Sequence, residues 1–195
     1  GGMDAFQIDG GRPLRGTVRA PGSKNASLPL MAAALLTDQP VTLRDVPDLA
    51  DVRGMVRLLT TLGCAAEREA DSRAVHLHTT DRSQSQAHYE IVRTMRAGIC
   101  VLGPLLARRG YACVSMPGGC AIGDRPVDLH LRGLRALGAR IHLEKGYIVA
   151  EAPGGRLKGA EVFLGGPNGS TVTGTANVMS AAVLAEGRTM IECAA

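Results

Sequence analysis

Aromatic residues are scarce in this chain, which has two Phe, three Tyr and no Trp among 195 residues. The stacking platforms on which single-stranded nucleic acids bind are therefore not expected. No tract of Lys or Arg concentrates the net charge of +4 into a stretch that would hold a polyanion. The small excess of basic residues favours anionic ligands without requiring polyanions. The core must be built from Ala, Val, Leu and Ile.

The five cysteines form an odd set without the CxxC spacing of metal and redox motifs. No apolar signal segment precedes them, and the apolar stretches, such as 28–36, are too short to span a bilayer. We therefore predict a protein of the reducing cytoplasm with no membrane partner. The length allows one sizeable core, or one full domain with part of another.

Three segments spaced about 70 to 75 residues apart share a pattern in which a helix rich in small residues precedes a short strand. They begin at Lys24, Arg93 and Thr173. A second, amphipathic helix follows the first two copies, at 51–63 and 128–138, and ends in Leu-Gly, where glycine suits a left-handed cap. Paired strands follow these helices, and Lys145-Gly146 suits a tight hairpin turn between two of them.

Each unit therefore follows the order βαβαββ, and we predict an α+β fold of mixed sheets with helices and a pseudo-threefold repeat. Opening strands are expected at Thr17 to Ala20, near Tyr89, and at Glu161 to Leu164. The third unit stops at Ala195, where its second helix should begin. We expect this unit to be truncated relative to the architecture.

Two of the helix starts carry cations. A Gly-containing turn precedes the helix that begins at Lys24, and backbone N–H groups with the helix dipole favour an anion there. The GxxxxGK[ST] spacing of a P-loop is absent. Arg93 and Arg96 are expected to share a helix face in the second repeat, where a basic first turn opposes the dipole unless an anion compensates. A capped helix with a solvated lysine, and two surface arginines, remain the alternatives.

The segment 117–130 combines Gly, Pro and one cysteine ahead of a helix, which predicts an irregular loop. Cys120 lies at its most permissive point, and the nearby Arg125 would lower the pKa of its thiol. We predict an exposed, reactive Cys120 rather than a buried one. The remaining cysteines are expected to be structural and lie in apolar contexts: Cys64, Cys100, Cys113 and Cys193.

In their order these motifs resemble the UDP-N-acetylglucosamine enolpyruvyl transferase (MurA) family, from about residue 3 to the end of the chain. The matching residues are Lys24-Asn25, Thr94-Met95-Arg96-Ala97, Pro117-Gly118-Gly119-Cys120, Ile122-Gly123, Arg125-Pro126-Val127-Asp128-Leu129-His130 and Leu184-Ala185-Glu186-Gly187. The resemblance implies two domains of three repeated units, with the substrates in the cleft between them. Residues 21–195 would form the domain with the catalytic Cys loop, incomplete at its C-terminal end, and 1–20 would join the absent second domain.

The resemblance implies transfer of the enolpyruvyl group from phosphoenolpyruvate to the 3-hydroxyl of UDP-N-acetylglucosamine, with release of phosphate, as the first committed step of peptidoglycan precursor synthesis. No metal or organic cofactor is implied. Cys120 would be the general acid that protonates the enol methylene, and the thiolate that fosfomycin alkylates. The expected partners are the two substrates and the missing C-terminal domain, without which we expect little turnover.

The resemblance also implies roles for individual residues. Lys24, Arg96 and Arg125 would hold the phosphate and carboxylate of phosphoenolpyruvate, and Asn25 would position the sugar. The catalytic set is Cys120, Lys24, Asn25 and Arg125. Nucleotide contacts, largely through backbone donors, are expected at Arg125, Pro126, Val127, Asp128 and Leu129. Further contacts are expected at Thr171, Val172 and Thr173, in a Gly-rich segment, 165–175, that departs from the family's Ser-Val-Gly-Ala-Thr.

Three alternatives remain open. A shikimate-pathway enolpyruvyl transferase would share the fold and chemistry but lacks the Pro-Gly-Gly-Cys loop. A non-enzymatic RNA-binding module fits the basic pI, although the scarcity of aromatic residues opposes it. A metal site at His76 and His78, on one strand face, has no third ligand at a fitting spacing.

Overall fold

The computed structural model describes residues 5–69, 72–117 and 127–195. Three units follow one another along the chain, and each has a small sheet of its own. Within the described ranges, no helix has the length and apolar character needed to cross a membrane.

The first unit packs two helices on an antiparallel sheet. Its strands lie in the order β1-β3-β2, with Cys64 opposite Thr79 and Arg68 opposite Val75 in the β2–β3 pair. The elements are α1 (Lys24–Ala33), η1 (Ala34–Leu36), β1 (Val41–Leu43), α2 (Ala50–Thr61), β2 (Cys64–Arg68) and β3 (Val75–Thr79).

The second unit contains the complete βαβαββ order, and its sheet is mixed. The strand order is β4-β5-β7-β6, in which only the β4–β5 pair is parallel. The elements are β4 (Gln86–Ala87), α3 (Tyr89–Val92), η2 (Arg96–Val101), α4 (Leu102–Arg109), β5 (Tyr111–Ser115), α5 (Asp128–Ala136), β6 (Arg140–Glu144) and β7 (Tyr147–Glu151).

The third unit matches the opening part of the second. After a short turn, η3 (Pro153–Gly155), the strands β8 (Glu161–Phe163) and β9 (Met190–Glu192) pair in parallel around helix α6 (Val172–Val183). The same arrangement joins β4, the helices after it and β5. The predicted α+β class and repeated unit are therefore confirmed.

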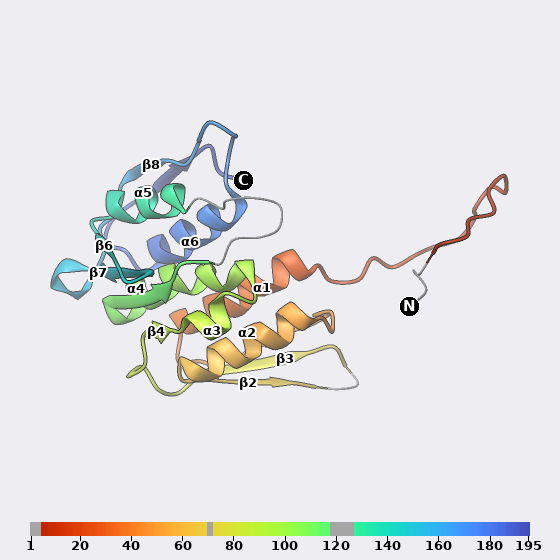
Figure 1. Ribbon diagram of the computed structural model, residues 1–195, viewed down its shortest axis with the longest axis horizontal. Coiled ribbons are helices and arrows are strands. Elements are labelled where there is room, and N and C mark those ends of the chain that lie inside the picture. Colours follow the sequence, from red (N-terminus) through yellow and green to blue (C-terminus); the bar gives the residue numbers. More distant parts are fainter. Residues whose placement is uncertain (1–4, 70–71, 118–126) are drawn as a thin grey trace.

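The helices that open the units pack together as the centre of the core. Helix α6 packs on α4, on α5 and on α1, and α1 also packs on α2 and η2. Figure 1 shows α1, α4 and α6 in the middle of the body, with the first unit's sheet at one end and α5 with β8 at the other. The large buried side chains are aliphatic, as predicted, together with methionine: Met31, Leu35, Met55, Leu58, Leu105, Leu106 and Leu134.

Local sequence signals located several boundaries correctly. Gly63 and Gly138, just after α2 and α5, have φ of 78° and 91°, as a left-handed cap requires. Lys145 and Gly146 also have positive φ, at 48° and 82°, in the tight turn that joins β6 to β7.

Two expected elements do not form as predicted. Residues Thr17 to Ala20 form no strand; they belong to an exposed arm that leaves the body in Figure 1. The three-residue β1 would offer few ladder bonds to offset the entropy of ordering this arm. The expected helix from Arg93 to Ala107 is interrupted, because Met95 is extended, with φ −147° and ψ 128°. This break buries the Met95 side chain against Gly54 of α2.

Candidate functional site

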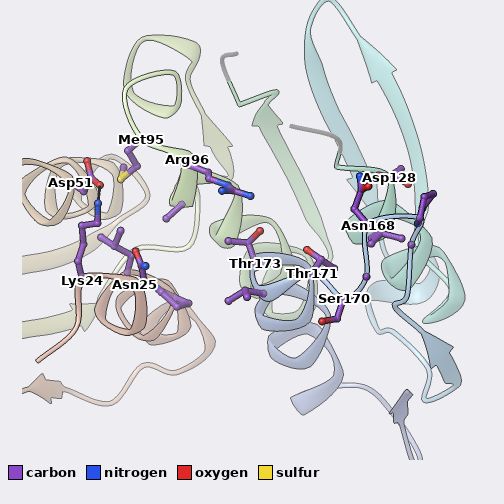
Figure 2. Close-up of a pocket in the computed structure, with 18 of the residues that line it drawn as sticks. Lys24, Asn25, Asp51, Met95, Arg96, Asp128, Asn168, Ser170, Thr171 and Thr173 are labelled. Atoms are coloured by element: carbon purple, nitrogen blue, oxygen red, sulfur yellow. Dashed lines mark ion pairs between the residues drawn. The ribbon is translucent and has the colours of Figure 1, made fainter. Parts of the chain in front are cut away.

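A hollow with a volume of about 880 Å³ lies where the three units meet. Residues from the starts of α1, α2, η2, α5 and α6 line it. The first turns of these helices carry backbone N–H groups without intrahelical partners, so their positive ends converge on one space. Figure 2 shows Lys24, Asp51 and Arg96 on one side and Asp128, Asn168 and Ser170 on the other. The arrangement suits an anionic ligand that touches all three units.

Lys24, at the start of α1, forms an ion pair with a residue of α2. Its Nζ lies 2.8 Å from Oδ2 of Asp51, the acidic residue in the first turn of α2, and both side chains are partly exposed. Figure 2 shows this pair together with the neighbouring Asn25, which is exposed. Ion pairs at such positions contribute only about 0–1 kcal/mol, so an incoming anion can displace the carboxylate at small cost.

Arg93 and Arg96 do not share a helix face, which corrects the prediction. Arg93 follows α3, where its Nε lies 3.2 Å from Oε2 of Glu90 and its guanidinium lies over the Tyr89 ring. Because the backbone at Met95 is extended, Arg96 does not continue the helix that precedes Arg93. Arg96 is the first residue of η2, and its exposed side chain lines the hollow. Arg96 is therefore the arginine of this pair that faces a ligand.

The glycine-rich segment before α6 forms a tight turn at the edge of the hollow. Gly166 and Gly169 exchange backbone hydrogen bonds of 2.9 and 3.0 Å, which puts Pro167 and Asn168 at its tip. Thr171 then caps α6, because its hydroxyl oxygen accepts the Gly174 N–H at 3.1 Å. The departure from the family pattern thus supplies a hydrogen-bonded turn and a capped helix on the hollow.

A neutral polar cluster is buried directly behind this helix start. Oγ1 of Thr173, which lines the hollow, lies 3.2 Å from Nε2 of His130, a ring only 3% exposed. Nδ1 of His130 lies 3.0 Å from Nδ2 of Asn177. Burial, with the nearby Arg96 cation as a second cause, lowers the pKa of His130 to about 4, against a smaller opposite effect of Asp128. His130 is therefore neutral near pH 7.

Most of the predicted site residues are brought together on the hollow: Lys24, Asn25, Arg96, Asp128, Leu129, Thr171, Val172 and Thr173. Val127 is buried just before α5 and does not line it. Cys120, Arg125 and Pro126 lie outside the described residues. Asp51 and Asn168 were not predicted as site residues, since ordinary surface positions carry the same residue types.

The other cysteines and histidines mostly behave as structural residues. Cys64 and Cys100 are buried, and burial raises the pKa of Cys100 to about 12. Cys193 is exposed, contrary to expectation, because it lies just after the end of β9, where its φ is 55°. Among the residues that the structure describes, no group of three or more His, Cys, Asp or Glu could hold a metal. His76 instead lies beside Thr42.

Curated relatives match nearly all of this chain. The protein called UDP-N-acetylglucosamine 1-carboxyvinyltransferase from Anaeromyxobacter sp. strain Fw109-5 is 56% identical over 190 residues, which is 97% of this chain and 44% of the relative. The protein of that name from Akkermansia muciniphila is 52% identical over 99% of this chain and 44% of its own length. The chain therefore spans less than half the length of these relatives.

Solved structures agree on the fold. The enolpyruvyl transferase NikO from Streptomyces tendae has a TM-score of 0.75 at 19% identity, covering 93% of this chain and 41% of its own. EPSP synthase from Acinetobacter baumannii has a TM-score of 0.66 at 19% identity, covering 90% and 40%. The family model for EPSP synthase (3-phosphoshikimate 1-carboxyvinyltransferase) matches residues 8–195. The chain therefore belongs to the EPSP synthase family, and its sequence is 52–56% identical to two relatives called UDP-N-acetylglucosamine 1-carboxyvinyltransferase.

Proposed function

We propose that this chain is the N-terminal portion of an enzyme that transfers the enolpyruvyl group of phosphoenolpyruvate to the 3-hydroxyl of UDP-N-acetylglucosamine. The observation that carries the proposal is the hollow on which the helix starts of all three units converge with Lys24 and Arg96. Both substrates are anions, and both need cations and backbone donors. Relatives at 52–56% identity support the nucleotide sugar as acceptor, whereas the similar EPSP synthase structure is only 19% identical.

The proposed chemistry is an addition followed by an elimination. The sugar hydroxyl oxygen bonds to C2 of phosphoenolpyruvate, the double-bond electrons take a proton at C3 from the Cys120 thiol, and a base takes the hydroxyl proton. In the second step the C2–O bond to phosphate breaks, C3 loses a proton, and the double bond reforms in the product. Lys24, Arg96 and Arg125 would offset charge on the phosphate and carboxylate. The roles of Cys120 and Arg125 rest on the family resemblance.

The proposal includes a second domain that this chain does not supply. Relatives are more than twice as long, since the chain covers 44% of them. Residues 5–20 are exposed throughout, and their apolar side chains are uncovered, with Phe6 99% exposed and Val18 93%. Such an arm is better accounted for by a partner domain than by the body it leaves. In the cell, the whole enzyme would act in the cytoplasm in peptidoglycan synthesis, as a fosfomycin target.

The test is binding and turnover by the 195-residue chain. Titration with UDP-N-acetylglucosamine should shift amide NMR signals at the starts of α1, η2, α5 and α6, while phosphate release from phosphoenolpyruvate stays near background. Arg96→Gln should weaken the binding of phosphoenolpyruvate, measured in the presence of UDP-N-acetylglucosamine, about tenfold, as loss of a charged hydrogen bond does. Arg93→Gln is the matched control, because that side chain pairs with Glu90 instead. Absence of binding, or turnover like that of a full-length enzyme, would contradict the proposal.

A further inference from the structure

The buried cluster behind α6 connects the hollow to two segments of the second unit. Asn177, on α6 and fully buried, accepts the Gly103 N–H through Oδ1 at 2.7 Å and donates from Nδ2 to the Ile99 carbonyl at 2.7 Å. Ile99 lies three residues after Arg96 in η2, and Gly103 is in the first turn of α4. One amide therefore fixes the segment that carries Arg96 relative to the start of α6.

The two hydrogen bonds to the backbone determine the orientation of the Asn177 side-chain amide. A reversed amide would direct its NH₂ at the Gly103 N–H and its oxygen at the Ile99 carbonyl, and both contacts would be repulsive. The second proton of Nδ2 then faces Nδ1 of His130 at 3.0 Å. A ring nitrogen that faces a donor must accept, so the proton of the neutral imidazole is on Nε2.

The position of that proton decides what the Thr173 hydroxyl can do. With its proton on Nε2, His130 donates to Oγ1 of Thr173, 3.2 Å away. The Thr173 hydroxyl then acts as acceptor toward the protein, and its own proton has no other recorded partner among the described residues. Because Thr173 lines the hollow, that proton is available to an acceptor oxygen there. In the opposite tautomer Nε2 would be an acceptor, and the Thr173 hydroxyl would donate its proton to His130 instead of to a ligand.

We infer that His130, oriented by Asn177, is a positioning residue that turns the Thr173 hydroxyl into a hydrogen-bond donor for an oxygen of the bound nucleotide sugar. The choice of ligand rests on the proposed function, whereas the tautomer rests on the protein's own contacts. A second proton on His130 would put an N–H on Nδ1 against the Asn177 donor. The charged groups that bear on the ring are Arg96 of η2, which opposes protonation, and Asp128 of α5, which favours it.

The tautomer is tested first, without ligand. In ¹⁵N NMR spectra of the chain, His130 should show a proton on Nε2 and none on Nδ1 at pH 7. On addition of UDP-N-acetylglucosamine, the Nε2 signal should move in the unaltered chain and not in Thr173→Val. This readout separates positioning from a merely structural role. A proton on Nδ1, or a ligand response retained in Thr173→Val, would overturn the inference.

Binding of UDP-N-acetylglucosamine is tested second. Thr173→Val keeps the shape but removes the hydroxyl, and should weaken binding about tenfold. Thr173→Ser should restore it to within about threefold, because the donor returns. Thr60→Val is the control, since that hydroxyl donates to the Val56 carbonyl on the exposed face of α2. If Thr173→Val binds as tightly as the unaltered chain, only the inferred role of His130 and Thr173 is overturned. If the unaltered chain does not bind, the proposed function is overturned, and with it the ligand role of Thr173.

Discussion

On the α1–α2 side of the hollow, Lys24 meets Asp51 at partly exposed positions, whereas on the α5–α6 side Thr173 meets the buried ring of His130. The first contact is between two charges that water can reach. The second belongs to a chain of neutral groups in which every bond has a fixed direction. A ligand can therefore replace the Asp51 carboxylate beside Lys24 at little cost, but it must fit the donor that Thr173 presents.

The difference predicts which property a substitution on each side changes more, the affinity for a ligand or the free energy of unfolding. Exposed ion pairs contribute little to folding, and they remain available to anions. Buried polar groups are costly when a partner is removed, because the remaining groups lose both water and protein bonds. Substitutions on the α1–α2 side should therefore change ligand affinity more than the free energy of unfolding. Substitutions of buried residues on the α5–α6 side should mainly lower the free energy of unfolding.

The largest expected effect is that of Asn177→Leu. This change leaves the Gly103 N–H, the Ile99 carbonyl and Nδ1 of His130 without their partner in a fully buried place. The free energy of unfolding should fall by about 3–5 kcal/mol, several times the cost of one exposed bond. Urea denaturation followed by circular dichroism measures it.

Asn25→Leu is the matched control on the other side of the hollow, where the same residue type is exposed. It should change the free energy of unfolding by less than about 0.5 kcal/mol, as is usual for surface substitutions. Similar losses in the two variants would mean that the two sides do not differ as the contacts indicate.

The next effect is the pH dependence of folding. Because burial lowers the pKa of His130 to about 4 in the folded chain, the unfolded chain binds one more proton between about pH 6.5 and 4. Stability from this group is therefore complete above about pH 6.5 and is lost as the pH falls toward 4, by roughly 3 kcal/mol in all. The free energy of unfolding, measured in urea at intervals of pH, should fall through this window.

His130→Gln should be less stable at pH 7 but should lose this part of the slope, because glutamine does not titrate. His78→Gln, at an exposed position on β3, controls for the loss of one histidine from the surface. A slope that His130→Gln leaves unchanged would show that His130 is already accessible to protons in the folded chain.

The sequence predicted the repeated unit because its signals are local. Leu-Gly at the ends of α2 and α5, and Lys145-Gly146 in the hairpin, depend on the backbone of a few neighbouring residues. The same reasoning located Lys24 and Arg96 on the hollow, since helix starts that recur in a repeat come together around its axis.

Long-range contacts were not predictable in this way. Asn177 is one of several polar residues of α6, and its partners lie 47, 74 and 78 residues away. At the break, Met95 packs beside Gly54 of α2, a contact that no pattern within 93–107 encodes. The expected strand at 17–20 had a suitable composition but no pairing partner in the described structure.

The smallest expected effect tests the exposed side of the hollow. Asp51→Asn removes the charge that pairs with Lys24, so the free energy of unfolding should change by less than about 1 kcal/mol. The affinity for inorganic phosphate should rise about two- to fivefold, because phosphate no longer has to displace a carboxylate from Lys24. The gain, measured by calorimetry, should shrink at about 0.5 M salt, where the charges are screened.

Asp48→Asn is the control for this variant, because its pair with Arg53, at 2.6 Å, lies outside the hollow. It should leave the phosphate affinity unchanged. Weaker phosphate binding by Asp51→Asn would mean that the carboxylate holds the Lys24 ammonium in place for the ligand instead of competing with it. In that case the two sides of the hollow would work alike, each with a second residue that orients the one in contact with the ligand.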